Sequence, residues 1–267
     1  MATVVDCADP VALLPGMRAA RTALAHGELV VVPTDTVYGI AADAFDAGAV
    51  QRLLDAKGRG RQAPPPVLVP TRATLDALAE VVPPSITVLA DAFWPGPLTI
   101  VLPARSSLAW DLGETGGTVA LRMPNQRIVL ELLAETGPLA VSSANLTGQP
   151  AATNVEEAHA QLGESVKVYL DGGATPGPEP STIVDATALA DGTGPLRILR
   201  VGVISEAQLR DASPEAFQAL VVEPAVEDVA DEPEPSTEEP VTDEPPAARP
   251  APAPTDSAPP ESAEPRP

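Results

Sequence analysis

The sequence predicts an α/β protein built on a twisted sheet of mixed parallel and antiparallel strands, with helices packed on it. Short apolar runs rich in β-branched residues occur beside longer segments in which apolar residues recur every three or four positions. The first pattern is typical of buried strands and the second of amphipathic helices. Because the two patterns do not alternate strictly, they favour a mixed sheet over a purely parallel one.

The acidic C-terminal part of the chain differs sharply in composition from the rest. Residues 221–267 contain 13 acidic and 2 basic residues, many prolines and no aromatic residue. A segment so charged and so poor in large apolar side chains cannot bury enough surface to fold. We therefore expect a folded domain at residues 1–220 and a disordered acidic tail at residues 221–267. Of the net charge of −21, about −10 then belongs to the domain.

Charge and cysteine content narrow the class of protein. A strongly acidic chain is a poor general nucleic-acid binder, because phosphate contacts need clustered lysines and arginines. The single cysteine, Cys7, excludes an intramolecular disulfide and fits a reducing compartment. No stretch reads as a signal peptide, and no apolar run approaches the roughly 20 residues that a membrane span requires. We expect a cytoplasmic protein without a membrane segment.

The elements of the N-terminal half follow from their apolar spacing. Residues 10–26 predict a helix with Leu13, Leu14, Met17 and Leu24 on its apolar side. A buried strand at 28–33 follows, and Val50, Leu53 and Leu54 then give helical spacing up to Lys57. The next predicted elements are a strand at 66–69, a helix at 71–82 with Thr71 as N-cap, a helix at 84–93 and a strand at 97–104.

The C-terminal half repeats the same two patterns. A strand at 118–123 precedes a helix that Asn125 is expected to cap, and a strand at 138–143 comes next. Asn154 caps the following helix, with Glu157 three residues later in a capping-box arrangement. The closing strands are predicted at 166–170, 181–186 and 196–202.

Two of these strands end in clusters of hydroxyl and amide side chains. "PTDTVYGI" at 33–40 follows one apolar run, and "VSSANLTG" at 141–148 contains the end of another. Each cluster alone is explained by polar side chains that satisfy their own turn. Two strand ends of this kind in one domain favour a common ligand cleft, because ligands commonly bind at strand ends in α/β sheets.

Positively charged residues form a second group of candidate ligand-binding residues. "AKGRGR" at 56–61 places three cations at the end of a helix, where they either complement the helix dipole or clamp a phosphate or carboxylate. The stretch lacks the order of a P-loop. Arg122 lies inside an apolar strand and needs an anionic partner, whereas Arg200 is explained equally well as a surface charge. With no His/Cys metal cluster and no GxSxG motif, the residues favour a site that positions anions and hydroxyl-bearing ligands.

Taken in order, these stretches resemble the YrdC-type threonylcarbamoyl-AMP synthases. The resemblance covers about residues 10–205 and rests on "PTDTVYGI", "KGR", "PPPVLV", "FWPGPLTIVL", "LRMP", "SSANLTGQPAAT", "STIVD" and "ILRVG". Several motifs in one order are far more specific than any one alone. The resemblance implies a YrdC-like fold in its short, single-domain form.

The resemblance also implies a reaction. Members of the family form L-threonylcarbamoyladenylate and pyrophosphate from L-threonine, bicarbonate or CO2, and ATP, with Mg2+ entering on the ATP. The product serves the threonylcarbamoyladenosine modification of tRNA beside the anticodon. The partners to expect are therefore a threonylcarbamoyl-transfer complex and, by a weak contact, tRNA. Positioning and matched cations can drive such a phosphoryl-group reaction without a protein nucleophile.

The functional residues of the family carry over to the motifs above. On the threonine side of the site the resemblance places Thr36, Arg122, Ser143 and Ser181. On the ATP side it places Lys57, Arg59, Thr118, Asn145, Thr153 and Arg200, with Lys57 and Arg59 expected to act in catalysis. At a position where some members have a histidine that contacts threonine, this sequence has Leu68.

Two other functions compete with the synthase. One is a non-catalytic RNA-binding or ribosome-maturation protein of the same fold, which the negative charge of the domain disfavours. The other is a paralogue that acts on a different substrate. Joint binding of ATP and threonine separates the synthase from both.

Overall fold

The computed structural model describes residues 1–218. Within them lie eight α-helices, which are α1 (Pro10–Ala25), α2 (Ala47–Ala56), α3 (Ala73–Leu78), α4 (Pro84–Phe93), α5 (Arg127–Thr136), α6 (Val155–Leu162), α7 (Thr187–Ala190) and α8 (Glu206–Ala212). Two 3-10 turns, Gly163–Ser165 and Pro214–Phe217, complete the helical segments of this part of the chain. The acidic tail predicted at 221–267 lies outside the described residues, so the predicted domain boundary stays a prediction.

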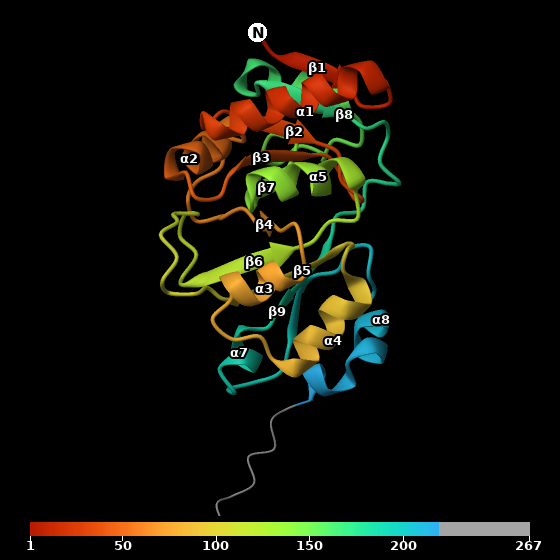
Figure 1. Ribbon diagram of the computed structural model, residues 1–267. Coiled ribbons are helices and arrows are strands. Elements are labelled where there is room, and N and C mark those ends of the chain that lie inside the picture. Colours follow the sequence, from red (N-terminus) through yellow and green to blue (C-terminus); the bar gives the residue numbers. More distant parts are fainter. Residues whose placement is uncertain (219–267) are drawn as a thin grey trace, which may run out of the picture. The chain divides into compact units, whose positions relative to one another are not determined.

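One ten-stranded sheet runs through the described residues (Figure 1). Its strands are β1 (Thr3–Asp6), β2 (Val30–Val32), β3 (Gly39–Asp43), β4 (Val67–Leu68), β5 (Leu98–Pro103), β6 (Thr118–Arg122), β7 (Leu139–Ser143), β8 (Val168–Asp171), β9 (Thr182–Asp185) and β10 (Arg197–Arg200). The spatial order is β1-β8-β2-β3-β7-β4-β6-β5-β9-β10. Four of the strand pairs are parallel and five are antiparallel, which confirms the predicted mixed sheet.

Helices cover both faces of the first half of the sheet. Val30 and Val32 pack with apolar residues of α1 and α5, whereas Val31 packs with residues of α2 and α6. Alternate residues of a strand point to opposite faces, so a run of three valines belongs to a strand buried on both sides. α1 and α5 pack against each other on the face that carries Val30 and Val32 (Figure 1).

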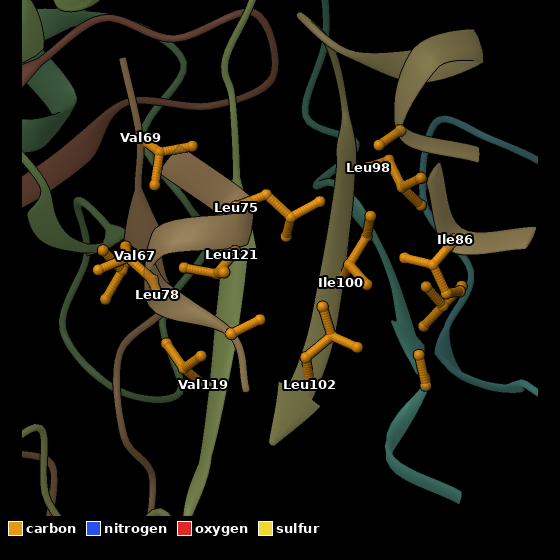
Figure 2. Packing of buried hydrophobic residues seen from close by; sticks show 14 of the residues in the cluster. Val67, Val69, Leu75, Leu78, Ile86, Leu98, Ile100, Leu102, Val119 and Leu121 are labelled. Atoms are coloured by element: carbon orange, nitrogen blue, oxygen red, sulfur yellow. The ribbon is translucent and has the colours of Figure 1, made fainter. Parts of the chain in front are cut away.

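The second half of the sheet is packed by helices on one face, and this arrangement leaves the other face free for a site. The core of this half comprises Leu98, Ile100 and Leu102 of β5 with Val119 and Leu121 of β6, under α3, α4 and α8 (Figure 2). The intervening residues, among them Thr99, Thr118, Ala120 and Arg122, therefore point to the opposite face.

Several sequence predictions about helix ends are wrong. The helix predicted at 71–82 spans only Ala73–Leu78, and the Thr71 hydroxyl lies 3.0 Å from the Thr74 hydroxyl instead of capping the helix. Gln126, not Asn125, caps α5, because its side-chain oxygen accepts from two backbone N–H groups of the first turn. Leu14 is 61% exposed although its spacing predicted the apolar side of α1.

The cap of α6 is confirmed in part. The Asn154 side chain accepts from the Glu157 N–H at 2.8 Å as predicted, but the Glu157 carboxylate accepts from the Thr153 N–H. The strands β1 and β3 and the short helices α7 and α8 were not predicted. None of the helices within residues 1–218 combines the length and apolar character needed to cross a membrane.

Candidate active site

A cavity of about 560 Å³ lies on the sheet face opposite the core of Figure 2. Alternate residues of three neighbouring strands form its floor: Thr99 and Val101 on β5, Thr118 to Arg122 on β6, and Ile183 on β9. The two hydroxyl-rich stretches at 33–40 and 141–148 form one wall, so the predicted convergence of these strand ends is confirmed. β3 and β7 pair antiparallel, with Gly39 opposite Ser143, and this pairing brings the stretches together.

The polar lining of the cavity is suited to anions. Arg59, Arg122 and Arg200 line it, and no carboxylate is among the lining residues of the described chain. Nine residues that carry a hydroxyl are among the lining residues, namely Thr34, Thr36, Tyr38, Thr99, Thr115, Thr118, Ser142, Ser143 and Ser181, although the Tyr38 hydroxyl itself donates to the Gly173 carbonyl. Three cations without a lining counter-charge concentrate positive potential locally in a protein whose net charge is strongly negative.

Arg122 is held on three sides at the end of β6. Its Nε donates to the Gly96 carbonyl at 3.1 Å, its Nη1 to the Thr36 hydroxyl at 3.0 Å, and its Nη2 to the Asp35 carboxylate at 2.6 Å. Burial lowers the pKa of the Arg122 guanidinium, and the adjacent Asp35 charge opposes this effect. A guanidinium carries five N–H groups, so two remain for a ligand.

The hydrogen-bond directions in the threonine pair beside Arg122 can be assigned. The Thr34 hydroxyl donates to the Val37 carbonyl at 2.6 Å, so toward Thr36, 3.1 Å away, it can only accept. The Thr36 hydroxyl therefore donates to Thr34 while it accepts from Arg122. One lone pair of Thr36 is left, and it can accept from an amine or hydroxyl of a ligand.

The opposite wall of the cavity carries the second arginine. Arg200 donates to the Ser181 carbonyl through Nη2 at 2.7 Å and through Nε at 3.0 Å, and its Nη2 also reaches the Ser181 hydroxyl at 3.1 Å. That hydroxyl lies 2.9 Å from the Thr99 hydroxyl. Partial burial, and then the nearby Arg122 charge, lower the pKa of Arg200. As a residue Arg200 is exposed, as the surface-charge interpretation expects, but its hydrogen bonds to Ser181 hold the guanidinium at the cavity wall.

Lys57 lies behind the wall of the cavity. Its ammonium donates to the Ser143 carbonyl, to the Asn145 carbonyl at 2.7 Å and to the Asn145 side-chain oxygen at 3.3 Å. The Lys57 carbonyl accepts from the Thr147 N–H at 2.9 Å, so the loop wraps around this residue. Burial, and then the Arg59 charge, lower the pKa of Lys57 to about 8.

The chain turn after α2 separates the cations of the "AKGRGR" stretch. Gly58 has φ +60°, a conformation that favours glycine, and the turn directs Lys57 inward while Arg59 reaches the cavity. The Arg59 Nη1 lies 3.3 Å from the Ser142 hydroxyl. Arg61 instead pairs with Asp111 at 2.5 Å on the rim, and both side chains are more than 40% exposed.

The sequence comparison decides the relationship of this chain to known proteins. The model of the Sua5/YciO/YrdC family, described as "Telomere recombination", matches residues 22–202. This chain belongs to the Sua5/YciO/YrdC family. The resemblance to YrdC-type proteins noted in the sequence is thereby confirmed.

Two curated relatives and one solved structure show how far the similarity to known proteins extends. A Mycobacterium leprae protein named "Putative threonylcarbamoyl-AMP synthase" is 51% identical over 211 residues, which cover 79% of this chain and 94% of the relative. The Pyrococcus abyssi threonylcarbamoyl-AMP synthase is 38% identical over 174 residues, 64% of this chain and 51% of that protein. The crystal structure of P. abyssi Sua5 complexed with L-threonine has a TM-score of 0.73 at 31% identity, over 81% of this chain and 62% of that one.

The Sua5/YciO/YrdC resemblance assigned ten residues to the site, and eight of them line the cavity. These eight are Thr36, Arg59, Thr118, Arg122, Ser143, Asn145, Ser181 and Arg200. Lys57 and Thr153 are not among the lining residues. The Thr153 hydroxyl donates to the Glu157 carboxylate at 3.1 Å and so belongs to the start of α6. The roles of all ten residues toward ligands remain proposals.

Sequence reasoning about this family member missed several residues of the site. Thr34, Asp35 and Thr99 carry the hydrogen bonds that hold Arg122, Thr36 and Ser181. Of these three residues, only Thr99 could have been predicted from the sequence, because it alternates with Leu98 and Ile100 in a strand whose other face is apolar. Thr34 and Asp35 stand within "PTDTVYGI", but their partners are distant in sequence.

Proposed function

We propose that this protein is a threonylcarbamoyl-AMP synthase, which forms L-threonylcarbamoyladenylate and pyrophosphate from L-threonine, bicarbonate or CO2, and ATP. The observation that carries the proposal is the cavity lined by three arginines and by serine and threonine residues, without a carboxylate among the described lining residues. Membership in the Sua5/YciO/YrdC family and relatives that bear the synthase name support it. The related structure that is complexed with L-threonine supports the choice of amino acid.

The amino acid is proposed to bind between Arg122 and Thr36. The two N–H groups that Arg122 has left suit the carboxylate of an amino acid, since guanidinium and carboxylate geometries match. The lone pair of Thr36 suits a donor of the same ligand, an amine or hydroxyl group. Ser143 and Ser181, which line the neighbouring wall, complete the side assigned to threonine.

ATP is proposed to take the remainder of the cavity. Arg59 and Arg200 lie where the triphosphate needs counter-charge, and Thr118 and Asn145 line the same space. Lys57 acts through the loop whose Ser143 and Asn145 carbonyls it holds, rather than from the lining. Mg2+ is proposed to enter as part of the MgATP substrate, since the lining offers hydroxyls and arginines and no carboxylate to bind the ion alone.

The chemistry that follows requires positioning more than acid–base catalysis. The neutral threonine amine adds to CO2, loses one proton to water and gives a carbamate, whose oxygen forms a bond to the α-phosphorus of ATP. The bond from that phosphorus to the bridging oxygen breaks, and pyrophosphate leaves with the electron pair. Arginines beside the phosphates stabilise the charge that develops in this step. The wider partners, a threonylcarbamoyl-transfer complex and tRNA, belong to the same proposal and lie downstream of the adenylate.

Joint binding tests the proposal directly. Calorimetry should show that L-threonine and MgATP bind at one-to-one stoichiometry, and that each still binds when the other is present. Mutual exclusion would contradict a cavity that holds both ligands. Binding of RNA that survives moderate salt, without ATP or threonine binding, would instead favour the RNA-binding alternative.

A further inference from the structure

Asp35 is a nearly buried carboxylate whose described contacts are confined to one residue. Its Oδ1 accepts from Arg122 Nη2 at 2.6 Å, and only 12% of its side chain and 8% of that of Arg122 are exposed. Its second oxygen, Oδ2, is buried and has no hydrogen-bond partner within residues 1–218. Burying a carboxylate costs free energy unless the carboxylate is paired. The ion pair with Arg122 is therefore the interaction that stabilises the Asp35 carboxylate at this position.

Asp35 also stands apart from the ligand cavity. It is not among the residues that line the cavity of the three arginines; it borders a separate cavity of about 450 Å³ on its other side. Arg122 and Thr36 line the first cavity and Thr34 lines both. Asp35 therefore reaches a ligand of the first cavity through Arg122 and not by direct contact.

The hydrogen bonds of Arg122 show how Asp35 contributes to the orientation of the guanidinium. The Gly96 carbonyl and the Thr36 hydroxyl fix one side of the guanidinium, and Asp35 alone fixes Nη2. Without an acceptor there, only two hydrogen bonds hold the guanidinium, and a third N–H would compete for the ligand. With the acceptor present, the two free N–H groups are held in one direction before the ligand arrives, which lowers the entropy lost on binding.

Asp35 also offsets one of two neighbouring positive charges. Arg122 and Arg200 are close enough for their charges to interact, and Asp35 forms an ion pair with Arg122. Asp35 thus lets two arginines stand close together at the site before the amino acid binds.

We propose that Asp35 is the positioning residue of the amino-acid subsite, which orients the Arg122 guanidinium so that its free N–H groups receive the substrate carboxylate. This inference rests on the proposed function, because it takes threonine as the ligand of Arg122. It assigns Asp35 to the affinity for the amino acid and gives it no part in ATP binding or in the phosphoryl-group step.

Substitutions at Asp35, assayed by pyrophosphate release, test the inference. Asp35→Ala removes the acceptor and should raise KM for threonine about tenfold or more, while kcat and KM for ATP change less than about threefold. Asp35→Asn keeps a side-chain oxygen for Nη2 and should recover most of the loss. Asp111→Asn is the matched control, since it changes another short Asp–Arg contact, the exposed pair with Arg61, and should leave KM for threonine unchanged.

The Arg122→Lys background separates positioning from a general structural role. In that background the Asp35→Ala change should add nothing to KM for threonine, because the group that Asp35 orients is gone. Additive effects of the two changes would overturn the inference, as would a folded Asp35→Ala protein with unchanged KM for threonine. Equal losses in the Ala and Asn variants would overturn it too, because the amide retains the acceptor.

A further variant keeps the test decisive if Asp35→Ala does not fold. Asp35→Glu retains the charge and displaces the acceptor by one methylene, so it should raise KM for threonine more than Asp35→Asn does. A smaller rise than in the Asn variant would contradict positioning. The unmodified protein is assayed first. Absence of threonine dependence there contradicts the proposed function, whereas threonine dependence that no Asp35 change alters contradicts this inference alone.

Discussion

At the scale of single residues, burial separates side chains that the sequence presents as equivalent. Lys57, Arg59 and Arg61 alternate with glycines in one short stretch, yet Lys57 is 1% exposed, Arg59 lines the cavity and Arg61 pairs on the rim. Spacing alone cannot show this, because the left-handed turn at Gly58 redirects the chain. Substitutions of these three residues are therefore expected to have different effects.

The pKa of Lys57 predicts how stability depends on pH. Its folded-state pKa of about 8 lies below the ordinary 10.5, so between these values the unfolded chain binds more protons and the free energy of unfolding rises with pH. Relative to Lys57→Met, the unfolding free energy of the unmodified protein should therefore rise by about 2 kcal/mol from about pH 8 to about pH 10. Urea denaturation of both proteins across this range measures the difference. A constant or falling difference would contradict the burial of a charged Lys57.

The two arginines after Gly58 form a matched pair. Arg59→Ala should lower kcat/KM for ATP by about a hundredfold without unfolding, since it removes a cation from the cavity. Arg61→Ala removes an exposed ion pair and should change kcat/KM less than about threefold. Steady-state kinetics at saturating threonine, with a circular dichroism melt of each variant, makes the comparison. Equal losses in the two variants would mean that charge near the helix end, and not the cavity contact, is what matters.

At the scale of elements, the rim of the cavity depends on one close approach of two loops. Gly113 has φ +105°, and a Cβ added to it would lie 2.7 Å from the Arg61 carbonyl oxygen. The Glu114 N–H donates to that same carbonyl at 2.8 Å. Backbone contact at this distance leaves no room for a side chain, so the loop that carries Leu112 and Thr115 into the cavity lining is held through a glycine.

Alanine at two glycines of this loop tests the contact. Gly113→Ala should lower the free energy of unfolding by about 2 to 3 kcal/mol and raise KM for ATP, because the loop must shift away from Arg61. Gly116→Ala meets nothing within 4 Å and carries only the strain of φ +60°, so it should cost about 1 kcal/mol and leave KM unchanged. Thermal melts and steady-state kinetics of both variants check this. If both variants keep KM for ATP unchanged, the close approach of Gly113 to Arg61 does not contribute to ATP binding.

Which elements the sequence could predict depends on whether their signal is local. The strands β2 and β5 carry continuous β-branched or alternating patterns, and both were predicted. β3 reads "GIAAD", without such a pattern, and is a strand because β2 and β7 pair with it on either side. The cap of α5 shifted from Asn125 to Gln126 because the two polar residues are adjacent, and only the backbone direction decides between them.

The same distinction holds within the site. Thr118 and Arg122 could be predicted to share a face, since they alternate with the apolar residues of one strand. The contact of Arg122 with Asp35 spans 87 positions and that of Thr99 with Ser181 spans 82. Partners so far apart meet only through the order of strands in the sheet, which no short window of sequence contains. The sequence therefore predicted the cations and several of their partners, such as Thr36 and Ser181, but missed Asp35 and Thr99.

At the scale of the whole molecule, the described lining of the cavity belongs to the part of the chain that the family model matches. The residues that line it come from positions 34 to 200, and the family match ends at residue 202. We therefore predict that deletion of residues 222–267 leaves kcat and both KM values within about twofold of the full chain, because the composition of these residues is that of a segment without a core of its own. Kinetics of the two proteins side by side measure this. A large loss of activity would show that the predicted domain boundary is misplaced.

The proposed synthase joins threonine, a one-carbon unit and adenylate in one product. Labelled bicarbonate supplied with MgATP and L-threonine tests this reaction, with L-serine and no amino acid as parallel reactions. We expect labelled threonylcarbamoyladenylate, released with an equal amount of pyrophosphate and dependent on threonine. Pyrophosphate release without label in the adenylate, or label incorporated equally well with any amino acid, would contradict it.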